Sequence, residues 1–218
     1  MPRSKAPRLG RPPASNAAET RQRIIATAAE LFAVNGYGVT TNKDVAAQAG
    51  ITTGALYYYF DSKLDMYLAV YAELAARVNE RLTGAMEAES TFAAKLRAVL
   101  EAVYQMNLED PSIARFLGTA RVDRLRHKEL MLAIPNSPGE GAQLVGPMLD
   151  AGVDSGEVDA DRRDVIAAVM RTIFVGLTDN SALSADPAYH RRAIDGIEAL
   201  FDGDLVRRPR RAPRRRAS

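Results

Sequence analysis

Apolar residues recur at helical spacing along nearly the whole chain, and this pattern constrains the fold more than any other feature. Ile24, Ala28, Leu31 and Phe32, for example, occupy the i, i+4, i+7 and i+8 positions of one helical face. No segment of the sequence alternates apolar and polar residues convincingly, as a half-buried strand would. With 47% hydrophobic residues among 218, the chain can bury a substantial core. The sequence therefore predicts an all-α protein.

Three helices are predicted before residue 61. The first covers about residues 17–35. Thr41 followed by Asp44 signals the start of a second helix of about eight residues, which Gly50 ends. A third helix follows the glycine turn and reaches Phe60; its candidate caps are Thr52 and Thr53. Two short helices joined by a tight turn, with a longer helix across them, form a helix-turn-helix arrangement.

The predicted third helix ends in three consecutive tyrosines at 57–59. Successive helical residues point about 100° apart, so when Leu56 and Phe60 define the buried side, Tyr58 points directly away from it. Gly54 shares that outer face, where a missing side chain lets the backbone approach another molecule. An exposed face of this kind suits the major groove of DNA.

Residues 19–66 resemble the DNA-binding domain of the TetR family of bacterial transcriptional regulators. The matching positions are Arg21, the stripe from Ile24 to Phe32, Gly36, Thr40-Thr41, Asp44-Val45-Ala46, Ala49-Gly50-Ile51-Thr52, the run from Gly54 to Phe60, and Ser62-Lys63. The resemblance implies a helix-turn-helix DNA-binding domain at 17–63 and a larger helical ligand-binding and dimerisation domain at 64–204. Asn42 departs from the pattern, because family members usually carry an apolar residue there.

The resemblance also implies which residues meet DNA. Tyr57 and Lys63 would contact phosphates, and Tyr58 would contact bases or backbone. Lys43 suits a phosphate contact as well, although an ordinary solvent-exposed lysine explains it equally. Tyr59 is expected to support packing of the small domain. The full candidate set is Thr41, Lys43, Thr52, Thr53, Gly54, Ala55, Tyr57, Tyr58 and Lys63.

Further helices are predicted near residues 90–109, 111–126, 139–154, 161–183 and 187–203. In the TetR family the final pair forms a four-helix bundle with a partner subunit, so the resemblance implies a homodimer through 161–183 and 187–203. A row of small residues, Ala168, Thr172 and Gly176, would let a neighbouring helix approach closely. Packing inside a single subunit explains these residues as well, and both readings stay open. A two-fold dimer would also read a palindrome, which one recognition helix cannot do.

A ligand cavity for an unknown small-molecule inducer is implied by the resemblance alone. The candidate lining residues are Tyr104, Met106, Phe116, Met148 and Phe174, and ordinary core packing is the alternative for each. Arg121 and Arg124 can meet an acidic ligand group or lie on a solvated helix face.

Positive charge is concentrated at the two ends of the chain. Residues 1–16 carry four basic residues and 205–218 carry seven, whereas all 27 acidic residues lie between these segments. Both arms are rich in proline and arginine, which predicts disorder and an affinity for a polyanion such as DNA. A purely solubilising role is the alternative for the C-terminal arm.

Other classes of function find little support in the sequence. Two histidines at unrelated positions and no cysteine predict no metal site, and neither a Walker lysine nor a GxSxG serine is present, so no cofactor and no enzymatic activity are expected. No apolar run reaches the ~18 residues of a membrane span, and a cytoplasmic location is expected. The resulting prediction is a ligand-responsive repressor that binds a palindromic operator, and the alternative is a DNA-architectural or nucleoid-associated protein without an inducer.

Overall fold

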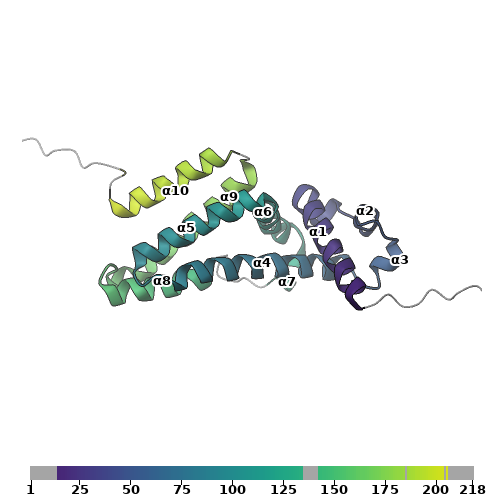
Figure 1. The fold of residues 1–218 in the computed structure, drawn as a ribbon, viewed down its shortest axis with the longest axis horizontal. Coiled ribbons are helices and arrows are strands. Elements are labelled where there is room, and N and C mark those ends of the chain that lie inside the picture. The colour runs from purple at the N-terminus through teal and green to yellow at the C-terminus, as the bar shows by residue number, and fades with distance from the viewer. Residues whose placement is uncertain (1–13, 135–141, 185, 204, 206–218) are drawn as a thin grey trace, which may run out of the picture. The chain divides into compact units, whose positions relative to one another are not determined.

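The computed structural model describes residues 14–134, 142–184, 186–203 and 205, and every regular element among them is a helix (Figure 1). The helices are α1 (Ala14–Val39), α2 (Asn42–Gln48), α3 (Thr53–Leu56), α4 (Lys63–Glu87), α5 (Phe92–Glu109), α6 (Pro111–Arg126), α7 (Lys128–Ala133), α8 (Ala142–Ser155), the short 3-10 helix η1 (Ala160–Arg162), α9 (Arg163–Leu183) and α10 (Pro187–Asp202). The predicted all-α class is confirmed. The predicted basic arms lie outside the described residues except for 14–16 and 205.

The chain divides into two compact units, and the division differs from the predicted boundary at residue 63. Among the described residues, the first unit comprises 14–74 with 116–134, and the second comprises 75–115, 142–184, 186–203 and 205. The boundaries fall inside α4 and inside α6, so each of these helices supplies residues to both units. A segment remote in sequence, 116–134, therefore belongs with the helix-turn-helix region.

An aromatic cluster forms the centre of the first unit. The Tyr67 ring lies 4.8 Å from that of Phe32, 5.1 Å from that of Tyr37 and 5.4 Å from that of Phe116. Asp123 of α6 is only 5% exposed, and its Oδ2 accepts hydrogen bonds from the Tyr37 backbone N–H at 2.8 Å and the Tyr67 hydroxyl at 3.2 Å. The end of α1 is thereby bonded to α6 within this unit.

Gly36 breaks α1 at the point where the sequence predicts the helix to stop. Its φ of 74° lies in the left-handed region that glycine adopts without a steric penalty. A Cβ at this position would meet Asp123 Oδ1 at 3.1 Å. The break directs Tyr37 and the following residues toward α2 while leaving room for the buried carboxylate.

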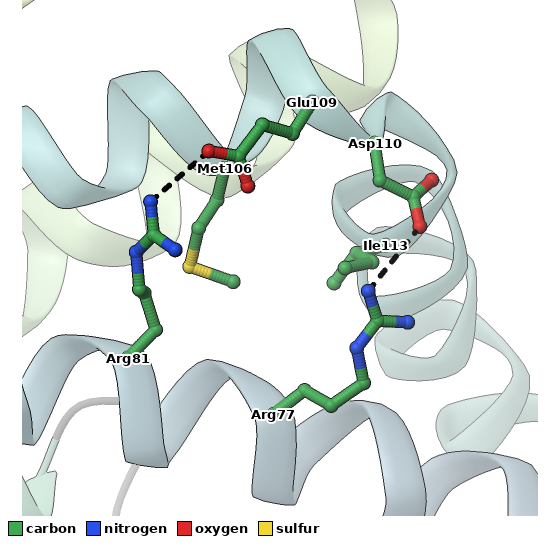
Figure 2. A pocket seen from close by; sticks show the side chains of 6 residues that line it. All are labelled: Arg77, Arg81, Met106, Glu109, Asp110 and Ile113. Atoms are coloured by element: carbon green, nitrogen blue, oxygen red, sulfur yellow. Dashed lines mark hydrogen bonds and ion pairs between the residues drawn. The ribbon is translucent and has the colours of Figure 1, made fainter.

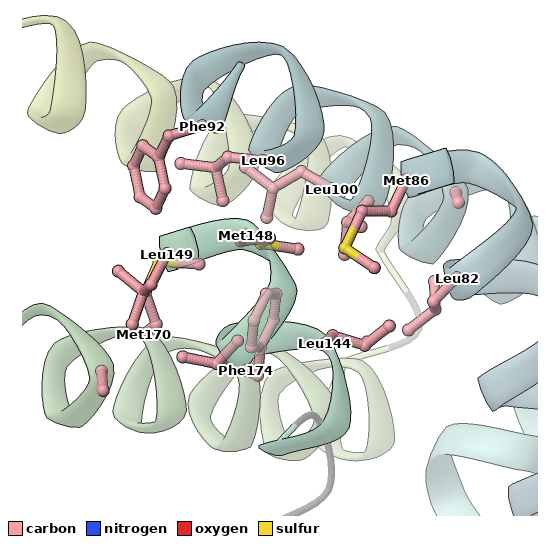
Figure 3. Close-up of a cluster of buried hydrophobic side chains, with 14 of the residues drawn as sticks. Leu82, Met86, Phe92, Leu96, Leu100, Leu144, Met148, Leu149, Met170 and Phe174 are labelled. Atoms are coloured by element: carbon pink, nitrogen blue, oxygen red, sulfur yellow. The ribbon is translucent and has the colours of Figure 1, made fainter. Parts of the chain in front are cut away.

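The second unit has its own apolar core, built from the second half of α4, α5, α8, α9 and α10 (Figure 3). Met148, Leu149 and Met170 are completely buried there. Helix α9 carries two apolar rows, and the one containing Met170, Phe174 and Leu177 is buried in this core. Val165 and Val169 of the other row remain exposed.

Glu157 caps α5 from a distant part of the second unit. Its Oε2 accepts from the Phe92 backbone N–H at 2.7 Å, and its Oε1 accepts from the Ala93 N–H at 3.4 Å. Burial opposes ionisation of this carboxyl, but hydrogen bonds from Ser155 and from the two N–H groups lower its pKa on balance. The charge also lies at a helix N-terminus, where a carboxylate is favoured.

A small polar cluster joins α5, α9 and α10. Asn107 donates to Ser181 Oγ at 3.0 Å, Ser181 Oγ lies 3.4 Å from His190 Nε2, and the His190 ring lies 5.8 Å from the Tyr104 ring. Charged neighbours on these helices pair with one another: Arg191 bonds Glu101 and Asp195. His190 is 6% exposed, and burial lowers its pKa.

Stability is therefore expected to fall as the pH is lowered from 7.5 to 5.5. The unfolded chain binds a proton at His190 near pH 6.5, whereas the buried ring resists protonation, so its contribution is complete above that pH and is lost as the pH falls through the lowered folded-state pKa. Urea unfolding at both pH values measures the free energy of unfolding. His190→Gln should flatten the dependence. An equally steep dependence in that variant would contradict the assignment to His190.

Candidate DNA interface and ligand pocket

The N-terminal caps of α2 and α3 form as the sequence predicts. The Thr41 hydroxyl oxygen accepts from the Asp44 N–H at 3.2 Å, and Asp44 Oδ2 accepts from the Thr41 N–H at 3.0 Å, which completes a capping box. The hydrogen bond from the Thr41 hydroxyl, followed by that from its backbone N–H, lowers the pKa of Asp44. Thr52 caps α3 by accepting from the Ala55 N–H at 3.1 Å. Gly50, at φ 68°, makes the turn between the helices.

Helix α3 is shorter than predicted, because it ends at Leu56 and not at Phe60. Beyond Leu56 the chain tightens, and the N–H groups of Tyr58 and Tyr59 bond to carbonyls three residues back instead of four. The side chains nevertheless point in the predicted directions. Leu56 and Phe60 are buried, while Tyr58 is 72% exposed.

The three tyrosines have different surroundings. Tyr57 is 50% exposed, and its hydroxyl oxygen accepts a hydrogen bond from Asn42 Nδ2 at 3.2 Å. Tyr59 is half-buried and meets the Tyr58 ring edge to face, with centroids 5.3 Å apart. Gly54 lies on open surface, since a Cβ there would have only Thr52 Oγ1 nearby, at 3.9 Å.

The Lys63 side chain makes contacts that the sequence did not predict. Its Nζ donates to the backbone oxygens of Tyr37 at 2.7 Å and Thr40 at 3.1 Å, and it lies 4.3 Å from the centre of the Tyr37 ring. Two of its three N–H groups are thus engaged within the first unit. The phosphate contact of Lys63 stays a prediction that the third N–H would have to fulfil.

The remaining candidates for DNA contact share one stretch of the first unit. Thr41, Lys43, Thr52 and Gly54 are exposed, and Thr53 and Ala55 are half-buried. Helices α2 and α3 pack against each other, and Val45, Ala46 and Leu56 hold them to the interior. The polar side chains are therefore presented on a well-packed support.

Comparisons with known proteins place this interface in a family. Residues 24–70 match the family model described as bacterial regulatory proteins, tetR family. Over 96 residues the chain is 36% identical to the uncharacterized HTH-type transcriptional regulator TtgW of Pseudomonas putida, and the match covers 44% of this chain and 72% of that protein. The chain belongs to the TetR family. The HTH-type transcriptional regulator SrpR of Pseudomonas putida is also 36% identical over 96 residues, but these make up 44% of this chain and only 45% of SrpR.

A solved TetR-like transcriptional regulator from Rhodococcus sp. RHA1 has the same fold. Its TM-score is 0.69 over 91% of this chain and 98% of the other, at 20% sequence identity. The order of an N-terminal helix-turn-helix region and a larger helical region is thus that of the TetR family. Among the described residues no helix is both long enough and apolar enough to cross a membrane.

The second unit of this TetR-family chain contains a pocket of about 360 Å³ (Figure 2). Arg81 and Arg77 project from α4 and form ion pairs with Glu109 at 3.0 Å and Asp110 at 3.7 Å. Met106 and Ile113, which complete the lining, lie between these pairs. The pocket therefore combines an apolar floor with two guanidinium groups that are about half exposed.

The predicted ligand-binding residues are not gathered in this pocket. Only Met106 lines it. Tyr104, Met148 and Phe174 belong to the apolar core of the second unit, and Phe116 packs in the aromatic cluster of the first. Arg121 and Arg124 also lie in the first unit, where Arg124 donates to the Ile134 carbonyl.

Sequence reasoning missed the two arginines of the pocket. Arg77 and Arg81 are four residues apart on α4, a spacing that places them on one helical face. Their acidic partners lie at the end of α5, which only the tertiary structure brings opposite. The i, i+4 spacing is the only signal that the sequence offered.

Proposed function

We propose that this TetR-family protein is a repressor that binds a palindromic operator as a homodimer and is released by a small-molecule ligand. The observation that carries the proposal is the surface of α2 and α3, where Tyr58, Gly54 and the capping threonines are presented on a buried support. A helix of this kind reads base edges in the major groove, and a dimer places two such helices about one DNA turn apart.

Exposed apolar residues on α9 support dimerisation. Val165 is 66% exposed and Val169 is 43% exposed, and the neighbouring Ala168 and Thr172 are also accessible. Gly176 is open, with nothing within 4 Å of a Cβ built on it. This stripe of apolar and small residues would lose water contact if a second subunit packed closely against it.

The pocket supports a ligand with an acidic group. A carboxylate or phosphate of a small molecule can replace Glu109 or Asp110 as partner of an arginine, while Met106 and Ile113 accept an apolar portion. Helices α4 and α6 each continue into the first unit, so ligand binding can favour an arrangement of the dimer that fits the operator poorly.

Mapping of binding sites across the source genome tests the proposal. A regulator should give a few discrete palindromic sites upstream of genes, and the purified protein should protect one of them as a dimer. Uniform coverage would favour the alternative of a DNA-architectural protein. A thermal-shift screen of amphipathic acids then tests ligand binding. Arg77→Ala and Arg81→Ala are expected to abolish the rise in thermal midpoint that any such ligand causes.

Tyr58→Ala is expected to weaken operator binding about tenfold while leaving the affinity for random DNA nearly unchanged, because an exposed side chain directed at bases adds sequence discrimination. Titration of both DNAs by fluorescence anisotropy measures the two affinities. Lys43→Ala is the matched control: a phosphate contact should weaken both DNAs alike and reduce the salt slope by about one. Equal losses on both DNAs for Tyr58→Ala would contradict a base-reading role.

A further inference from the structure

The hydrogen bond between Asn42 and Tyr57 orients a group on the proposed DNA surface. Asn42 is the first residue of α2, directly after the Thr41 capping box, and Tyr57 is the C-terminal cap of α3. The bond at 3.2 Å therefore joins the two helices of the helix-turn-helix at their exposed edges. The phenol ring is held at its hydroxyl end as well as at its backbone.

The direction of this hydrogen bond determines which hydrogen-bonding group of Tyr57 remains available. An amide nitrogen can only donate, so the Tyr57 oxygen is the acceptor and its own O–H proton is not used by Asn42. Tyr57 is 50% exposed, which leaves that proton available to an acceptor outside the protein. A phosphate oxygen of the DNA backbone is such an acceptor.

The oxygen of the Asn42 amide lies in an unfavourable environment. Its Oδ1 is buried and has no hydrogen-bond partner among the described residues. An unpaired buried acceptor destabilises the fold, whereas an apolar side chain of similar shape would not. The amide therefore carries a stability penalty at a position next to the DNA-reading surface, a pattern typical of functional sites.

We propose that Asn42 is a positioning residue that holds the Tyr57 hydroxyl in the orientation needed to donate to a DNA phosphate. This inference rests on the proposed DNA-binding function. Asn42 acts through Tyr57 and need not touch DNA. Immobilising one side chain before binding improves affinity about three- to tenfold, because less conformational entropy is lost on association.

A double-mutant cycle in the full-length protein tests the assignment. The probe is a duplex containing one of the mapped operator sites, and affinities are measured for the unmodified protein, Asn42→Leu, Tyr57→Phe and the double variant. We expect Asn42→Leu to weaken binding about three- to tenfold and Tyr57→Phe about tenfold. In the Tyr57→Phe background, Asn42→Leu should have no further effect.

A stability measurement separates positioning from a structural role. Because Asn42→Leu removes an unpaired buried oxygen, its thermal midpoint without DNA should equal or exceed that of the unmodified protein. Asn79→Leu makes the same substitution at an exposed position of α4 in the second unit, and it should leave operator affinity unchanged.

Three outcomes would overturn the inference while leaving the proposed function in place. Unchanged operator affinity in Asn42→Leu would contradict the inference directly. A loss that persists in full in the Tyr57→Phe background, or one that follows a lowered thermal midpoint, shows that Asn42 acts by another route. Failure of the unmodified protein to prefer any mapped site over random DNA is a different result, because it overturns the proposed function and this inference with it.

Discussion

Asp123→Ala is expected to lower the free energy of unfolding by about 3 kcal/mol, measured by urea denaturation at neutral pH. The substitution removes Oδ2, which accepts from both the Tyr37 backbone N–H and the Tyr67 hydroxyl. Both donors would remain buried without a partner, and each unpaired donor costs about 1–3 kcal/mol. Tyr67 is completely buried, so water cannot replace the carboxylate without opening the aromatic cluster.

Two further variants apportion this effect. Asp123→Asn keeps a carbonyl oxygen that can accept both hydrogen bonds, so its loss should be less than half as large. Tyr67→Phe removes one donor, and Asp123→Ala in that background should cost about 1 kcal/mol less than in the unmodified protein. Asp154→Ala, an exposed aspartate in the second unit, is the control. If Asp123→Ala destabilises no more than Asp154→Ala, the hydrogen bonds to Asp123 contribute little.

Both tyrosines around Asp123 keep their protons in the folded protein. Burial, together with the nearby Asp123 carboxylate and its hydrogen bond, raises the pKa of Tyr67. Burial and then a hydrogen bond to Glu129 raise the pKa of Tyr37 to about 12. The Tyr67 hydroxyl therefore keeps its proton and donates to Asp123 at neutral pH.

Local signals explain why much of the helix-turn-helix could be predicted from the sequence. The Thr41 and Asp44 capping box, the positive φ of Gly50 and the Thr52 cap each depend on residues within about five positions of one another. The outward direction of Tyr58 also follows from its neighbours Leu56 and Phe60. Such features require only that the segment be helical and have one buried side.

Contacts between remote segments account for what the sequence did not reveal. The role of Asp123 depends on α6 meeting the end of α1, 86 residues earlier. No residue near Lys63 in the sequence indicates that its Nζ donates to carbonyls 23 and 26 residues away. The pocket arginines Arg77 and Arg81 likewise depend on how α4 meets the end of α5. No local period or spacing encodes these pairings.

Among the described glycines of the second unit, Gly152 is expected to tolerate replacement by alanine least. Gly152 lies inside α8, and the chain after α8 folds back so that the Val158 N–H donates to the Gly152 carbonyl at 2.9 Å. A Cβ on Gly152 would lie 2.6 Å from Val158 Cγ2 and 2.9 Å from Phe92 Cβ. Both neighbours are buried, so the added carbon must displace Val158 and the start of α5.

The expected loss is about 2 kcal/mol of unfolding free energy, because overpacking of about 1–3 kcal/mol outweighs the gain of up to ~1 kcal/mol from replacing a helical glycine. Gly84→Ala is the matched control, since it lies in α4 with nothing within 4 Å of the added carbon. That variant should be stabilised by about 0.5–1 kcal/mol. Chemical denaturation of the two variants should therefore give changes of opposite sign. If Gly152→Ala instead stabilises the protein as Gly84→Ala does, α8 and Val158 are not in close contact in solution, and the Glu157 cap on α5 loses the packing that holds it in place.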